Sequence, residues 1–279
     1  MCKKLLMLLM LFVALTFVSS ASAANMYWIG YDTDWLTASN WGGTGACPTY
    51  NDWVDIRSDS WVANYPVITT GQTALAGTIR MNPGYGPQVP SITVSGGTLN
   101  IYKELYIGDS GGPADFIINS GTVNIGVSGT NVYTAVGSNG GTGRLYINGG
   151  TFNAGTLGLP KWWGPASTGN AYIDGGHLNT NGIMMGGAGN AIEFTKNLAD
   201  SGGLLTDVQD MNDTDFAAWQ TTVAGWVSSG QIFSSAGEIQ VDYSSVGETR
   251  TTAIYSVIPE PMTVALLGIG GLLLRRRRK

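Results

Sequence analysis

The stretch from Ser91 to Gly189 repeats one short phrase four times: Gly96-Gly97-Thr98-Leu99-Asn100, Ser120-Gly121-Thr122-Val123-Asn124, Gly149-Gly150-Thr151-Phe152-Asn153 and Gly175-Gly176-His177-Leu178-Asn179. The second glycine of the phrase is Gly97, Gly121, Gly150 and Gly176 in turn, so the phrase recurs with a period in the twenties. A period of this length is typical of solenoid proteins, in which each repeat forms one turn and stacks on its neighbours. The phrase therefore predicts a repeat architecture.

Apolar and polar residues alternate on both sides of the second glycine. The apolar positions lie five before it, three before it and two after it: Ile92, Val94 and Leu99; Phe116, Ile118 and Val123; Leu145, Ile147 and Phe152; Ala171, Ile173 and Leu178. Side chains along a strand alternate faces, so each copy is expected to form strand, glycine turn and strand, with one apolar side. Because one such unit cannot bury that side alone, we expect an all-β fold, a β-solenoid in the form of a right-handed parallel β-helix with about five to seven rungs.

Two features of the phrase predict details of the stack. Asparagine closes all four copies, at Asn100, Asn124, Asn153 and Asn179, and identical amides in one slot are expected to form a hydrogen-bonded ladder. The second glycine is expected to have a positive φ, which glycine adopts at low cost.

A second family of segments follows the phrases and predicts another side of each rung. Its members are Leu105-Tyr106-Ile107-Gly108, Thr134-Ala135-Val136-Gly137, Gly155-Thr156-Leu157-Gly158 and Met184-Met185-Gly186-Gly187.

The composition fits one folded body between two processing segments. The chain has 279 residues, of which 43% are hydrophobic and only 12% charged, so it is not a disordered composition. We expect a solenoid body over residues 24–255, with an N-terminal cap at 24–60 and a C-terminal cap at 190–255.

The N-terminal segment 1–23 has the pattern of a secretory signal peptide. Lys3 and Lys4 form the basic start, residues 5–18 the apolar centre, and Ala21-Ser22-Ala23 a small-residue cleavage site. An uncleaved membrane helix is the alternative, but the apolar run is short for one.

Cleavage after Ala23 changes the cysteine content and the charge of the chain. It removes Cys2, so the exported chain keeps Cys47 alone and has no internal disulfide. It also removes two lysines, which leaves 12 basic against 19 acidic residues and a net charge of −7. Without the five basic residues of the C-terminal end, the rest of the exported chain has 7 basic residues against 19 acidic ones, a net charge of −12. Such an acidic body disfavours nucleic acid as a partner.

Both predicted caps contain tryptophan. The N-terminal one includes Trp28, Trp35, Trp41 and Trp53, which we expect to cover the first rung. Sugar stacking on exposed tryptophans is the alternative for this segment. In the C-terminal cap, the spacing from Asp213 to Val227 predicts a short helix with an N-cap at its start, followed by closing strands.

An insertion interrupts the third copy at Lys161-Trp162-Trp163-Gly164-Pro165. Insertions in solenoids form loops on one face, often the binding face. Two interpretations stay open for Trp162 and Trp163: contact with a glycan, or packing against a neighbouring loop.

The residue pattern does not predict catalysis, a metal site or a cofactor. The single histidine, His177, occupies the slot that threonine holds in the other copies, so it is a variant of a structural position. The acidic residues Asp207, Asp210, Asp213 and Asp215 lack EF-hand spacing, and a solvated helix start is favoured over a loose Ca²⁺ site. Polysaccharide lyases and hydrolases need convergent acid and base groups, whereas the predicted rung faces carry Asn, Thr, Tyr and Gly. We therefore expect no enzymatic activity.

The C-terminal end of the chain, from Pro259 onward, has three parts in a set order: Pro259-Glu260-Pro261, an apolar run over residues 262–274, and the basic run Arg275-Arg276-Arg277-Arg278-Lys279. This order resembles the C-terminal sorting signal of exosortase-dependent, PEP-CTERM proteins. The resemblance implies an exosortase-type membrane transpeptidase or protease as a partner. The body is more loosely similar to the Gly- and Asn-rich strand repeats of secreted bacterial proteins, including autotransporter-associated ones, which implies no activity.

The length of the apolar run bears on how long the tail stays in a membrane. Thirteen helical residues span about 20 Å, less than the roughly 30 Å of a hydrocarbon core. A transient transmembrane stop at 262–274, within a sorting segment at 256–279, therefore fits better than the alternative, a permanent C-terminal anchor. The five positive charges are expected to stay on the cytoplasmic side.

These observations predict a non-enzymatic exported protein. We expect it to associate transiently with the inner membrane and then to reach the cell surface or the extracellular matrix. The alternative function is a carbohydrate-binding or carbohydrate-active β-helix protein that acts on exopolysaccharide.

Overall fold

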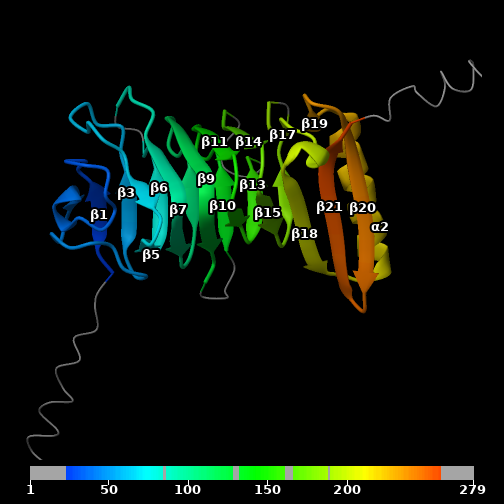
Figure 1. Cartoon of the computed structure of the whole chain (residues 1–279), viewed down its shortest axis with the longest axis horizontal. Helices are drawn as coiled ribbons and strands as arrows, with labels where there is room; N and C mark the ends of the chain where they lie inside the picture. The colour runs from blue at the N-terminus through cyan, green and yellow to red at the C-terminus, as the bar shows by residue number, and fades with distance from the viewer. Residues whose placement is uncertain (1–22, 84–85, 128–131, 161–165, 188, 259–279) are drawn as a thin grey trace, which may run out of the picture.

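Over the residues that it describes, the computed structural model is a β-solenoid of about seven turns with one α-helix near its C-terminal end. The structure describes residues 23–83, 86–127, 132–160, 166–187 and 189–258. Strands stack side by side along one long axis, from β1 at one end to β20 at the other (Figure 1). The prediction of an all-β solenoid is confirmed. The predicted signal peptide, apart from Ala23, and the tail from Pro259 onward lie outside the described residues.

One side of the solenoid is an eight-stranded sheet, here called the first sheet, in the order β16-β13-β10-β8-β6-β3-β1-β2. Its neighbours pair in parallel, except that β2 pairs antiparallel with β1 and ends the sheet. The second segment family supplies β8, β10, β13 and β16, as predicted. The strands of the first sheet are β1 (Asn25–Trp28), β2 (Trp41–Gly42), β3 (Trp53–Ile56), β6 (Thr78–Met81), β8 (Leu105–Ile107), β10 (Tyr133–Val136), β13 (Thr156–Leu159) and β16 (Ile183–Met185).

The second sheet has thirteen strands and contains all four copies of the phrase. In the first two copies β7 and β9 run through the glycine as single strands, whereas in the last two the same path is divided into β11 and β12, then β14 and β15. Its strands are β4 (Val67–Thr69), β5 (Thr73–Ala76), β7 (Ser91–Ile101), β9 (Pro113–Ile125), β11 (Thr142–Ile147), β12 (Thr151–Asn153), β14 (Thr168–Ile173), β15 (His177–Thr180), β17 (Ala191–Phe194), β18 (Leu204–Asp210), β19 (Ile232–Ser234), β20 (Glu238–Val246) and β21 (Thr249–Val257).

The core contains the apolar positions that the alternation predicts. All twelve of them, from Ile92 to Leu178, have no exposed surface. They stack in register: Phe116 pairs with Ile92 below it and with Leu145 above it. The rings of Phe116 and Phe152 lie 5.9 Å apart in the interior. Each turn thus buries its apolar side against the next, as the repeat requires.

The predicted asparagine ladder is present along the outer side of the second sheet. Each side-chain amide donates to the carbonyl oxygen of the asparagine one turn earlier. The nitrogen–oxygen distances are 2.8 Å from Asn124 to Asn100, 2.7 Å from Asn153 to Asn124 and 2.9 Å from Asn179 to Asn153. The three bonds run through four successive turns, so the side chains reinforce the backbone ladder.

The glycine in the phrase has a positive φ in three copies, at Gly121 (+91°), Gly150 (+74°) and Gly176 (+74°). A Cβ on Gly150 would lie only 2.4 Å from the carbonyl oxygen of Gly121 in the turn below, so space is also lacking. In the first copy the prediction is wrong by one residue, because the positive φ (+97°) falls on Gly96 and not on Gly97. The cause is an irregular register between β7 and its neighbours on both sides of this point.

Three tryptophans pack together at the N-terminal end of the solenoid, in the segment predicted as a cap. Trp28, Trp35 and Trp41 are almost fully buried, and Trp41 makes edge-to-face contacts with Trp28 at 4.8 Å and with Trp35 at 4.7 Å. Sugar stacking on these three is excluded by their burial. A 3₁₀ turn, η1 (Ala38–Asn40), joins this cluster to β2.

The C-terminal end is covered by α2 (Asp213–Ser228), which lies beside β20 and β21 (Figure 1). The predicted helix is confirmed, but its N-cap is Asn212, whose side chain accepts a hydrogen bond from the Asp215 amide at 2.9 Å. Val223 is buried against the core, and Trp219 donates to the Thr252 hydroxyl at 3.0 Å. A second 3₁₀ turn, η2 (Leu198–Asp200), precedes β18. The predicted closing strands are β19, β20 and β21, the last two in an antiparallel hairpin.

Candidate functional site

The residues singled out for sorting and glycan contact lie outside the described part of the chain. They are Trp162, Trp163, Pro259, Glu260, Pro261, Arg275, Arg276, Arg277, Arg278 and Lys279. Within the described residues, none of the helices has the length and apolar character needed to cross a membrane.

The other two candidates have structural roles in the stack. His177 is exposed and pairs in register with Thr151 and Leu204, as expected for the threonine slot. The four aspartates do not converge: Asp207 accepts from Thr180, Asp210 from Thr249, Asp213 from Arg250 and Asp215 from Asn212. In the described segments, no group of three or more His, Cys, Asp or Glu residues is placed to hold a metal ion.

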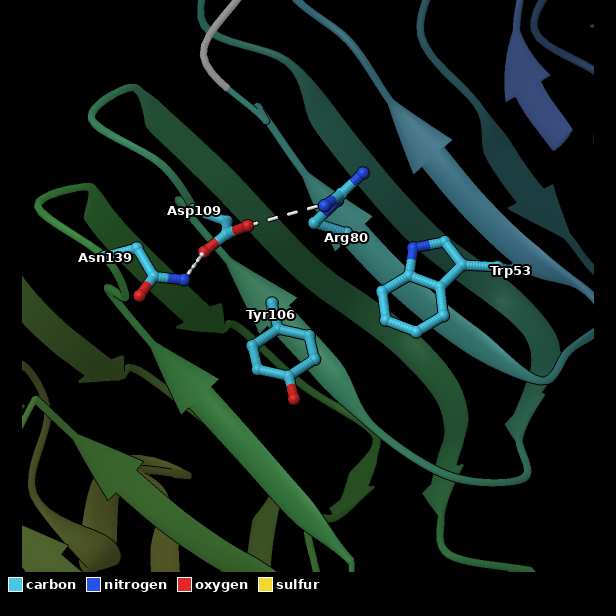
Figure 2. Close-up of a pocket in the computed structure, with 5 residues that line it drawn as sticks. All are labelled: Trp53, Arg80, Tyr106, Asp109 and Asn139. Carbon is cyan, nitrogen blue, oxygen red and sulfur yellow. Dashed lines mark hydrogen bonds and ion pairs between the residues drawn. The ribbon is translucent and has the colours of Figure 1, made fainter. Parts of the chain in front are cut away.

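A hollow of about 160 Å³ lies on the outer face of the first sheet and is lined by Trp53, Arg80, Tyr106, Asp109 and Asn139. Figure 2 shows Trp53 at one end, Asp109 and Asn139 at the other, and Arg80 and Tyr106 between them. We call these five residues the sheet hollow. Its volume is below the roughly 300–1,000 Å³ of pockets for drug-sized ligands, so it suits one ring-sized group.

Strand register builds the middle of the sheet hollow. Asp55 of β3 pairs with Arg80 of β6, and Arg80 pairs with Tyr106 of β8, so three successive turns present one side chain each. Trp53 lies two residues before Asp55 on the same face of β3, because side chains alternate along a strand.

The guanidinium group of Arg80 is held between carboxylates. Its Nε and one terminal nitrogen donate to the two oxygens of Asp55 at 3.0 and 3.1 Å, and Nε lies 3.9 Å from an Asp109 oxygen. Arg57 also donates to Asp55, at 3.2 Å. Two guanidinium groups therefore face two carboxylates, and the positive charge at the centre of the hollow is balanced.

Asp109 is fixed at the corner that follows β8. It is 3% exposed, and its side chain accepts hydrogen bonds from Ser138 at 2.5 Å, Asn139 at 2.8 Å and Ser110 at 3.0 Å. Both Asn139 and Ser110 have positive φ values, +48° and +55°, as expected in tight corners where the backbone turns sharply. Asp109 thus ties two successive corners together.

Two aromatic rings border the hollow. Trp53 is 39% exposed, and the Arg80 guanidinium carbon lies 5.6 Å from its ring centroid, a cation–π contact. The Tyr106 hydroxyl donates to Glu104 at 2.8 Å. Burial, together with the hydrogen bond and charge of Glu104, raises the pKa of the Tyr106 phenol well above its usual value, so the phenol stays protonated.

The sequence reasoning missed this site, although a signal for it was present. The spacing from Asp55 to Arg80 and the spacing from Arg80 to Tyr106 both match the repeat period in the twenties. Only Tyr106 belongs to a recognised repeat segment, and Trp53 was assigned to the N-terminal cap. Extending the period upstream of Ser91 aligns Asp55 and Arg80 with Tyr106.

Fold and site together define a β-solenoid with a small aromatic and charge-balanced hollow on one outer face. Comparisons of the chain with protein-family models, with curated proteins and with solved structures found no match.

Proposed function

We propose that the chain is a non-enzymatic exported protein of the cell envelope or the extracellular matrix, sorted through its C-terminal tail by an exosortase-type enzyme. The observation that supports this most is the position of the outermost strands among the described residues. The first of these strands starts at Asn25, two residues after the expected cleavage site at Ala23, and the last one ends at Val257, two residues before Pro259. Processing at both ends would leave every strand of the solenoid intact.

The contacts in the sheet hollow support a role without catalysis. A glycosidase uses one carboxylic acid to protonate the leaving group and a second carboxylate as base or nucleophile. Here Asp55 accepts from two arginines, and Asp109 accepts from three polar side chains. Hydrolysis or lyase products from any tested glycan would overturn the non-enzymatic proposal.

Replacement of Pro259, Glu260 and Pro261 by alanine tests the sorting proposal. We expect the altered protein to remain in the inner-membrane fraction, whereas the wild type reaches the cell surface or the medium. The matched control replaces three exposed residues of β20, Ser244, Ser245 and Val246, by alanine. That control should be exported normally. An unchanged distribution of the Pro259–Pro261 variant would contradict the proposal.

A second candidate function is carbohydrate binding, which the exposed indole of Trp53 beside Tyr106 favours. Trp162 and Trp163 remain candidates for the same role. Binding of the producer's exopolysaccharide that is lost in a Trp162→Ala, Trp163→Ala double variant would assign the contact to these two residues.

A further inference from the structure

We propose that the sheet hollow binds an uncharged saccharide, with one sugar ring packed on the indole of Trp53. The proposal deepens the proposed function, because it names the class of partner that an envelope or matrix protein would bind. It assigns the contact to the first sheet and not to the segment that contains Trp162 and Trp163.

The first argument concerns the shape of the site. Trp53, Arg80 and Tyr106 come from three successive turns, which at about 4.8 Å per turn span roughly 10 Å along the solenoid. A disaccharide-sized segment fits this length, and the hollow of about 160 Å³ takes one of its rings. The stacked backbone beneath keeps the side chains in place, so little ordering is needed on binding.

The second argument concerns the aromatic surface. Trp53 is 39% exposed, whereas Trp28, Trp35 and Trp41 on the neighbouring turns are almost fully buried. An indole face has negative electrostatic potential and attracts the weakly positive C–H groups of a sugar ring. Polar groups of Asn139 and Tyr106 lie along the same hollow (Figure 2) and suit the ring hydroxyls.

The third argument concerns charge and selects an uncharged ligand. The guanidinium of Arg80 is balanced by Asp55 and Asp109, so no surplus positive charge attracts a uronate or a phosphate. Outside the basic end, the exported chain has a net charge of −12, which repels acidic polysaccharides.

Calorimetric titration of the purified exported protein tests the proposal. The probes are three neutral oligosaccharides, cellohexaose, xylohexaose and mannohexaose, and one acidic one, hexagalacturonate. We expect at least one neutral probe to bind with a Kd on the order of 0.1–1 mM. We expect that Kd to change less than about twofold between 50 and 500 mM NaCl, because no net charge is involved. Failure of all neutral probes, or a preference for hexagalacturonate, would overturn the proposal.

A pair of variants locates the binding site. Trp53→Ala should weaken binding by about tenfold or more. Trp61→Ala removes another indole that is 54% exposed and does not line the hollow, so it should leave the Kd unchanged. Equal effects of the two substitutions would contradict the assignment, and so would binding that survives in Trp53→Ala but is lost in the Trp162→Ala, Trp163→Ala double variant.

Nuclear magnetic resonance of the wild type keeps the test independent of whether Trp53→Ala folds. The indole N–H signal of Trp53, assigned with Trp53→Phe, should shift as the bound oligosaccharide is added, while that of Trp61 stays in place. A titration that moves only other indole signals would overturn the proposal. Sorting is measured separately by cell fractionation, so failure of the sugar assay leaves the export proposal untouched, and the reverse also holds.

Discussion

Some polar side chains of this solenoid form hydrogen bonds to the same repeat position one turn away. The asparagine ladder is the clearest case, because the amide of Asn124 both donates to Asn100 and accepts from Asn153. Asn179, at the top of the ladder, donates to Asn153. The position of an asparagine in the ladder therefore determines how many side-chain hydrogen bonds are lost when it is replaced.

Asn124→Ala is expected to lower the free energy of unfolding by about 1–3 kcal/mol. It removes two hydrogen bonds, each with a net contribution of roughly 1 kcal/mol. Asn179→Ala, which removes one, should cost about half as much. Urea unfolding of both variants measures the difference. Equal losses, or none in Asn124→Ala, would show that the ladder does not contribute to stability.

Asp52 ties the expected new N-terminus to the second turn. It is 7% exposed, and its side chain accepts from the backbone nitrogen of Ala24 at 2.9 Å and from Thr49 at 2.7 Å. Burial alone would raise the pKa of this carboxyl, but the hydrogen bonds from Thr49 and Ala24 outweigh it and lower the pKa. Cleavage after Ala23 would turn the Ala24 nitrogen into an ammonium group beside this carboxylate.

Because the pKa of Asp52 is lowered in the folded state, the contribution of this carboxylate to stability decreases as the pH falls. The contribution is full above about pH 4, the usual Asp value, and is lost as the pH falls through the lowered pKa. Asp52→Asn should therefore be less stable than the wild type by about 1.5–3 kcal/mol at pH 6, with a smaller gap near pH 3. Asp200→Asn, an exposed control, should show no gap at either pH. A gap for Asp52→Asn that stays constant with pH would contradict this account.

At the scale of the elements, the glycine corner decides how closely one turn approaches the next. Gly121, Gly150 and Gly176 combine a positive φ with a Cβ position that a carbonyl oxygen already occupies. Gly71 has a similar φ of +83°, but a Cβ there would meet no described atom within 4 Å. Comparing alanine substitutions at Gly71 and Gly150 therefore separates the cost of backbone strain from the cost of steric overlap.

Gly71→Ala is expected to cost about 1–2 kcal/mol, the penalty for a left-handed backbone with a side chain. Gly150→Ala adds the overlap with the Gly121 carbonyl and should cost about 3 kcal/mol or more in total. Thermal unfolding of the two variants checks the order. A Gly150→Ala variant as stable as Gly71→Ala would mean that the turns separate easily.

The same elements show what sequence reasoning can and cannot reach. Alternation around the phrase predicted the buried positions, because burial in a strand follows a period of two. The phrase predicted a positive φ at Gly97, whereas the structure has it at Gly96. The shift arises from an irregular register with the neighbouring strands, which the phrase does not describe. The sheet hollow was missed because Trp53 and Arg80 lie upstream of the clear repeats, where only strand register brings them together.

At the scale of the whole molecule, the solenoid occupies nearly all of the chain between the two expected processing sites. Its N-terminal end is closed by β2 and the tryptophan cluster, and its C-terminal end by α2 and the β20–β21 hairpin (Figure 1). Closed ends limit open-ended strand pairing between copies. This arrangement is compatible with the export that we propose.

Intact-mass analysis of the protein recovered from the cell surface or the medium tests the central claim most directly. The account predicts a chain that begins at Ala24 and has lost Arg275 to Lys279, with the new C-terminus near Pro259-Glu260-Pro261. An exported form that keeps an intact Arg275 to Lys279 end would contradict it.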